Sequence, residues 1–180
     1  MRKLALLAVF VTGAALTLAG VSLARGGGDD DGGHASTRLT GYEETPSIST
    51  HARGSFEASI EDGKIEFRLR YEGLEGGNAS AAHLHLGQRH TPGGVSAFLC
   101  GGGGQAACPA GSADIKGEIV AANVIGPTGQ GISAGQFDEL VAAIRAGAVY
   151  ANVHTPTYPT GEIRGQLRGK GGKNGHGKDD

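Results

Sequence analysis

The sequence lacks the patterns by which several large functional classes are recognised. It contains no Gly-x-Ser-x-Gly nucleophile motif and no His-Glu-x-x-His zinc motif. The four glycines Gly101–Gly104 are not followed by the Lys-Ser/Thr pair of a phosphate-binding loop. Acidic residues (18) outnumber basic residues (16), whereas nucleic-acid binding depends on basic patches. The sequence therefore argues against these hydrolase and nucleotide-binding classes and against a nucleic-acid partner.

Cysteine is also scarce. The two cysteines, Cys100 and Cys108, are eight residues apart in a glycine-rich stretch. In an exported protein, such a pair is expected to form a disulfide that closes a short loop and adds about 2–3 kcal/mol of stability. The alternative is a thiolate metal site, but that site needs further soft ligands, and none lies near the two cysteines in the sequence.

The N-terminus has the pattern of a secretory signal peptide. A basic start, Met1–Lys3, is followed by an apolar run from Leu4 to Leu18 and by the small-residue signal Ser22-Leu23-Ala24, which predicts cleavage after Ala24. A retained membrane anchor is the alternative, although the run is shorter than the ~20 residues of a spanning helix. Cleavage leaves 14 basic against 18 acidic residues, a formal charge of −4. We expect a secreted, periplasmic or cell-surface protein with no transmembrane segment after cleavage.

The rest of the chain divides by composition into three parts. Residues 25–37 (RGGGDDDGGHAST) have no anchoring apolar residue and predict a flexible linker, and residues 169–180 predict a disordered tail. Residues 38–168 lie between them and have the size of one ordinary domain.

Within this domain the dominant hydrophobic period is two. From Lys64 to Tyr71 apolar and charged residues alternate, which indicates a strand with one buried face, and residues 54–60 pair with it as a hairpin. Further strands are expected at residues 38–42, 81–86, 95–99, 113–120, 148–154 and 161–167. Short strands separated by Gly and Pro turns predict a mainly β, antiparallel sandwich or barrel.

One helix interrupts the strands. Ser133 and Gln136 match a capping box, and Gly147 follows the segment as a stop signal. The apolar residues between them have helical spacing and form one stripe: Phe137, Leu140, Val141 and Ile144. We interpret this stripe as core packing.

Histidines provide the candidate functional site. In a strand, residues two apart share a face, so His83 and His85 point the same way, and His154 lies in another predicted strand. Ala82, Leu84 and Leu86 continue the apolar face, and Val153 does so in the later strand. The three imidazoles are therefore expected on outer faces of the sheets.

Three neutral histidines on such faces can bind a transition metal. His90, in the loop after residue 86, is a candidate fourth ligand, and His51 is a weaker one. Histidine nitrogens suit Cu(II) or Zn(II) better than Mg²⁺ or Ca²⁺. The alternative is structural: the same side chains can hydrogen-bond loop carbonyls and hold the ends of the strands.

The final predicted hairpin carries a polar group made of Asn152, Glu162 and Arg164. This group can present a polar patch to a ligand. Alternatively, Glu162 and Arg164 satisfy neighbouring strands, and we favour this structural interpretation.

Four sequence blocks, taken together, resemble the CHRD (chordin) domain family. They are Leu39-Thr-Gly-Tyr-Glu-Glu-Thr-Pro46, Ala81-Ala-His-Leu-His-Leu-Gly87, Gly135-Gln-Phe-Asp-Glu-Leu-Val-Ala-Ala-Ile-Arg-Ala-Gly147 and Tyr150-Ala-Asn-Val-His-Thr155 with Gly161-Glu-Ile-Arg-Gly-Gln-Leu167. The resemblance covers residues 38–168 and implies an extracellular antiparallel β-sandwich, immunoglobulin-like or superoxide-dismutase-like. A lone domain behind a signal peptide is similar to the bacterial members, so the growth-factor binding of animal chordin is not carried over.

The family blocks place His83, His85 and His154 in a pattern similar to the copper side of Cu/Zn superoxide dismutase. The chain lacks that enzyme's separate zinc-site run with a bridging histidine. The resemblance therefore implies an exported binding module with a surface histidine site for Cu or Zn and an extracellular or periplasmic ligand. The alternative is a copper-dependent redox enzyme.

Overall fold

The computed structural model describes residues 33–170. The predicted signal peptide, the first part of the predicted linker and residues 171–180 of the predicted tail lie outside this range. Within residues 33–170, no helix is long and apolar enough to cross a membrane.

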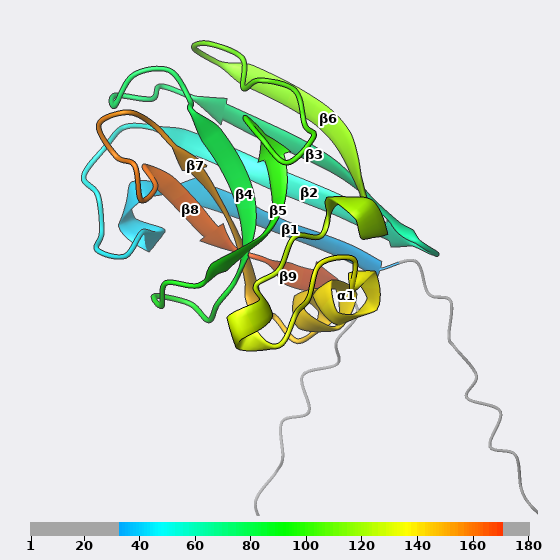
Figure 1. Cartoon of the computed structure of the whole chain (residues 1–180). Helices are drawn as coiled ribbons and strands as arrows, with labels where there is room; N and C mark the ends of the chain where they lie inside the picture. Colours follow the sequence, from blue (N-terminus) through cyan, green and yellow to red (C-terminus); the bar gives the residue numbers. More distant parts are fainter. Residues whose placement is uncertain (1–32, 171–180) are drawn as a thin grey trace, which may run out of the picture.

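The described part of the chain is built mainly of antiparallel strands that surround one core (Figure 1). The strands are β1 (Gly33–Thr40), β2 (Arg53–Glu61), β3 (Lys64–Glu72), β4 (Ala81–Leu86), β5 (Gly94–Cys100), β6 (Ala113–Val120), β7 (Val149–His154), β8 (Ile163–Gln166) and β9 (Arg168–Lys170). They form one sheet in the order β5-β4-β7-β8-β1-β2-β3-β6, with β9 also paired to β1. The sheet curls until it is nearly barrel-shaped, so the predicted mainly β, antiparallel fold with one short helix is confirmed.

The β2–β3 hairpin follows its hydrophobic pattern. Ile65 and Leu69 of β3 lie opposite Ile60 and Phe56 of β2, and all four side chains are at least 96% buried. The intervening charged residues of both strands face outward, as the alternation predicts. This hairpin supplies four of the twelve largest fully buried side chains of the described residues: Phe56, Ile65, Leu69 and Tyr71.

The first strand begins earlier than the sequence analysis expects. β1 starts at Gly33, inside the predicted linker, and pairs with β2 from Gly33 opposite Ile60 to Thr40 opposite Arg53. β9 likewise extends into the predicted tail and pairs with β1. Backbone hydrogen bonds form this pairing, and they do not depend on the small and polar side chains that suggested a linker. Ala35, 1% exposed, adds an apolar anchor on the core side.

The helix α1 (Phe137–Arg145) lies at one end of the barrel and leads into β7 (Figure 1). Its predicted apolar stripe is buried, which confirms the interpretation as core packing. The side chain of Gln136 accepts a hydrogen bond from the Ser133 backbone N–H at 2.6 Å, which is one half of the predicted capping box. Three short 3-10 turns, η1 (Gly41–Glu43), η2 (Ala121–Asn123) and η3 (Thr128–Gln130), complete the secondary structure.

Candidate metal centre

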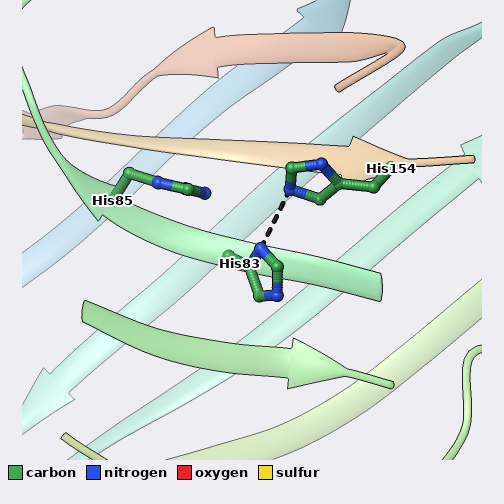
Figure 2. A group of neighbouring side chains, drawn as sticks. All are labelled: His83, His85 and His154. Carbon is green, nitrogen blue, oxygen red and sulfur yellow. Dashed lines mark hydrogen bonds between the residues drawn. The ribbon is translucent and has the colours of Figure 1, made fainter. Parts of the chain in front are cut away.

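The pairing of β4 with β7 brings the three histidines together. His154 lies opposite Ala81, and His85 lies opposite Tyr150. Because side chains alternate along both strands, His83, His85 and His154 share one face, while Leu84 points into the core. Figure 2 shows the three rings next to one another on β4 and β7, with the hydrogen bond between His83 and His154 dashed.

The distances are close to those of a metal site. Nδ1 of His83 lies 2.9 Å from Nε2 of His154, and one nitrogen from each of the three residues lies within 4.8 Å of the other two. Three nitrogens bound to one ion at ~2.0–2.1 Å lie about 3.3–3.6 Å apart. Binding therefore requires the hydrogen bond between His83 and His154 to open slightly and the widest separation to close by up to about 1.5 Å, which side-chain rotation can supply.

The histidines are on the outer side of the sheet, as expected, but they are not on the surface. His83, His85 and His154 are 9%, 6% and 8% exposed. The expectation of a surface site is therefore wrong. Loops after β4 and β7 fold over this side of the sheet, and the ring of Phe98 in β5 contacts His83 edge-on at 4.3 Å.

Burial keeps these histidines neutral. It lowers the pKa of His83 to about 3, with the neighbouring His154 and His85 adding to the effect. Burial also lowers the pKa of His85 to about 4, although a hydrogen bond to Gly93 opposes the shift, and it lowers the pKa of His154. A neutral imidazole has the free lone pair that a metal ligand needs, so at neutral pH protons do not compete with an ion.

Backbone carbonyls orient two of the rings. Nδ1 of His85 lies 2.9 Å from the Gly93 oxygen, and Nδ1 of His154 lies 3.0 Å from the Pro159 oxygen. A carbonyl only accepts hydrogen bonds, so both Nδ1 atoms carry the proton and both Nε2 atoms keep a lone pair. In metal sites, the ligating histidine typically donates its second nitrogen in this way.

Buried acceptors without partners gather around this cluster. Of the six buried side-chain atoms that lack a hydrogen bond in the described residues, five lie on or beside this face of β4, β7 and β8: His83 Nε2, His85 Nε2, Asn152 Oδ1, Gln166 Oε1 and Glu44 Oε1. Each such group costs about 1–3 kcal/mol. A cation offsets that cost, so the residues present fit a bound metal ion.

The other two histidine candidates do not join the cluster. His90 is exposed, in the loop after β4 with a left-handed backbone (φ 59°), so the prediction of a fourth ligand at this position is wrong. His51 lies on the surface, where its Nδ1 contacts Glu75 Oε1 at 2.6 Å. A histidine in a polar segment carries no information on its long-range proximity to other residues.

Glu162 of the predicted polar group anchors loops. It is fully buried, and its carboxylate accepts hydrogen bonds at 2.7–3.0 Å from Thr50, Thr155 and the backbone of Glu75 and Gly76. These contacts join the loop before β2, the loop after β3 and the end of β7. They match the structural interpretation that we favour for this residue.

Tyr150, which the sequence analysis did not single out, links the other members of the polar group to the histidines. Its ring stacks on His85 at 4.7 Å between centroids, and the guanidinium of Arg164 lies 3.4 Å above the Tyr150 ring. Arg164 also donates to the Gln88 and Thr91 carbonyls, and Asn152 lies next to it across β7 and β8. Period-two alternation from His154 would have placed Tyr150 and Asn152 on this face.

Cys100 and Cys108 form the predicted disulfide. Their loop passes over the ring of Phe98: a Cβ added to Gly102 or Gly103 would lie 2.5–2.6 Å from that ring. Only glycine allows this close approach. The loop therefore holds Phe98, which in turn covers His83.

The comparisons with known proteins agree with the resemblance in the sequence. A family model described as the CHRD domain matches residues 35–167, which is most of the chain. Among curated proteins and among solved structures, no match is found. The sequence blocks and the family model lead to the same conclusion: the chain belongs to the CHRD domain family.

Proposed function

We propose that this protein is an exported CHRD domain that binds a transition-metal ion, copper or zinc, through His83, His85 and His154. Export is supported by the signal-peptide pattern at residues 1–24 and by the disulfide, a bond typical of oxidising compartments. In this proposal the domain is a binding module for an extracellular or periplasmic ligand, with the metal ion as part of its binding site.

One observation carries the metal proposal: two of the three clustered imidazoles are already oriented by carbonyls. Gly93 and Pro159 accept from the Nδ1 atoms of His85 and His154, and this leaves both Nε2 lone pairs directed away from the backbone. Among the described residues, the Nε2 of His154 accepts a hydrogen bond from His83, but the Nε2 of His85 has no partner. A purely structural histidine cluster would not need to leave that buried nitrogen unsatisfied.

The test is a metal titration of the mature domain after removal of bound metal with a chelator. We expect elemental analysis to find one Cu or Zn per chain after reloading, and Tm to rise by several degrees at a free-ion concentration of about 100 Kd. The variant His83→Ala/His85→Ala should lose both effects. The variant His51→Ala/His90→Ala is the matched control, since it removes two exposed histidines, and it should behave as the wild type.

The structural alternative makes the opposite prediction. If the three histidines only brace loops, neither metal changes Tm, because only ligands that favour the folded state do so. Equal loss of binding in both double variants would also contradict the proposal, since the ion would then bind exposed histidines.

A copper-dependent redox enzyme similar to superoxide dismutase is the second candidate. The observation that favours it is the pair of polar acceptors beside the cluster, the side-chain oxygens of Asn152 and Glu44, which can accept hydrogen bonds from a protonated small molecule such as water or hydrogen peroxide. The test is superoxide consumption by the copper-loaded protein. Turnover that disappears in His83→Ala/His85→Ala supports the enzyme, and a rate equal to that of free copper contradicts it.

A further inference from the structure

From the distribution of charge around the cluster we infer that its preferred ion is monovalent: Cu(I) rather than Cu(II) or Zn(II). This inference rests on the proposed function, that a metal binds to His83, His85 and His154. It concerns which ion and which oxidation state the site stabilises.

The ligands bring no negative charge to the ion. All three are neutral imidazoles, and within the described residues no cysteine or carboxylate joins the group whose ligand atoms lie within 4.8 Å. The full charge of the ion therefore remains in a place that is nearly closed to water. The cost of burying a charge increases with its square, so a divalent ion costs about four times as much as a monovalent one.

A fixed positive charge adds to this preference. The order β4-β7-β8 places Tyr150 between His85 and Arg164, and the distances of 4.7 and 3.4 Å require the two groups to stack on opposite faces of its ring. The guanidinium is thus roughly 10 Å from an ion on His85. At an effective dielectric constant of about 20, its repulsion weakens binding of a divalent ion about tenfold more than binding of a monovalent ion.

The surrounding carboxyls offset this charge only in part. Among the described residues, no carboxylate lies within 4.0 Å of Arg164, which donates to neutral oxygens. Glu44 is the buried carboxyl beside Asn152, and burial raises its pKa to about 7. Glu43 is engaged with Arg89 in an ion pair. At neutral pH, a large fraction of Glu44 is therefore protonated and uncharged.

The number and the surroundings of the ligands also favour Cu(I). Zinc in proteins is almost always four-coordinate and adds water when the protein supplies three ligands. Here three nitrogens are available, and the rings of Phe98 and Tyr150 pack against His83 and His85. The low exposure of the three histidines keeps water from the site, and a water-poor shell of this kind raises the reduction potential of a bound metal.

The experiment compares the oxidation states of copper on the full domain under anaerobic conditions. Cu(I) affinity is measured by competition with a chromogenic Cu(I) chelator. The potential of bound copper is measured by redox-dye titration, with electron paramagnetic resonance to quantify Cu(II). We expect this potential to lie above that of the aqueous Cu(II)/Cu(I) couple.

Two variants test the electrostatic cause. Arg164→Met removes the positive charge and should lower the ratio of Cu(I) to Cu(II) binding constants about tenfold. Glu44→Gln removes a negative charge without touching the contacts of Arg164 and should raise that ratio at pH 8, where the wild-type carboxyl is ionised. Glu44→Gln therefore keeps the test decisive if Arg164→Met does not fold.

The outcomes separate this inference from the proposed function. Absence of binding by Cu(I), Cu(II) and Zn(II) overturns both. Binding with a potential below that of the aqueous couple, or no change of the ratio in Glu44→Gln, overturns the preference for Cu(I) and leaves the metal site in place.

Discussion

The two faces of the β4–β7 pair differ in how their buried groups are satisfied. On the inner face, Leu84, Ala151 and Val153 are fully buried among other apolar side chains. On the outer face, His83 and His85 are almost as buried, yet each keeps a nitrogen without a hydrogen-bond partner in residues 33–170. Burial alone therefore does not distinguish a core from a site. Buried hydrogen-bonding atoms without partners do distinguish a site from a core. Such atoms lower the stability of the fold, so stability does not explain why they are present.

The largest expected effect contrasts neighbouring residues of β4. Leu84→Ala should lower the free energy of unfolding by about 2–5 kcal/mol, because it leaves a cavity in the core. In metal-free protein, His83→Ala should cost less, about 1–2 kcal/mol, since it removes one unsatisfied nitrogen although it leaves Nε2 of His154 without its donor. Urea denaturation of both variants measures the difference. Equal costs would mean that the outer face is packed and satisfied like the core.

Low pH should lower the free energy of unfolding through the histidines of the outer face. The folded protein holds His83 and His85 with pKa values of about 3 and 4, below the usual histidine value of about 6.5, so protonation favours the unfolded chain. This stability is present above pH 6.5 and is lost as the pH falls from 6.5 toward 4, by about 3 kcal/mol for each of the two histidines. Unfolding curves across this range provide the measurement. A profile that stays equally steep in His83→Ala/His85→Ala would assign the loss to other groups.

The disulfide loop should stabilise the position of Phe98 over the outer face. Replacing both cysteines by serine is expected to cost about 2–3 kcal/mol through loop closure. It should also speed the release of metal, because the loop holds Phe98 against His83. Chelator-driven release rates check this second effect. If Phe98→Ala, with the disulfide intact, leaves the release rate unchanged, Phe98 is not the cover.

The smallest effect concerns Glu44. Burial raises its pKa from 4.5 to about 7, so the folded state keeps a proton that the unfolded chain releases. Its contribution to stability is complete below pH 4.5 and is lost as the pH rises to about 7. Glu44→Gln should therefore stabilise the protein at pH 8 by about 1–3 kcal/mol. Thermal unfolding against the exposed control Glu57→Gln measures this, and equal Tm changes in the two variants would contradict it.

Most of the fold could be predicted from the sequence, because hydrophobic alternation is a local signal. The strands around Phe67 and Leu84 and the helix at Leu140 follow their patterns within a few residues. The start of β1 at Gly33 and the short β9 could not be predicted in this way. Their side chains carry no alternation, and backbone pairing with distant strands forms them.

The candidate site was predictable in part. The spacing of His83 and His85 indicates a shared face, and the family blocks add His154. Glu44 and Phe98, however, carry no local signal, because they reach the site from other segments of the chain. The same reason explains the error over His90, which is close to His85 in sequence but outside the cluster.

By itself, the sequence determined the antiparallel β fold, the disulfide pair and the common face of His83 and His85, since each follows from residue spacing. Only the tertiary structure decided that this face is buried, that Arg164 and Tyr150 lie beside it, and that a nitrogen of His83 and of His85 lacks a partner within the described part of the chain. Exposure and electrostatic surroundings depend on which loops fold over a strand. These long-range contacts are made by segments far apart in the chain, so no local pattern encodes them.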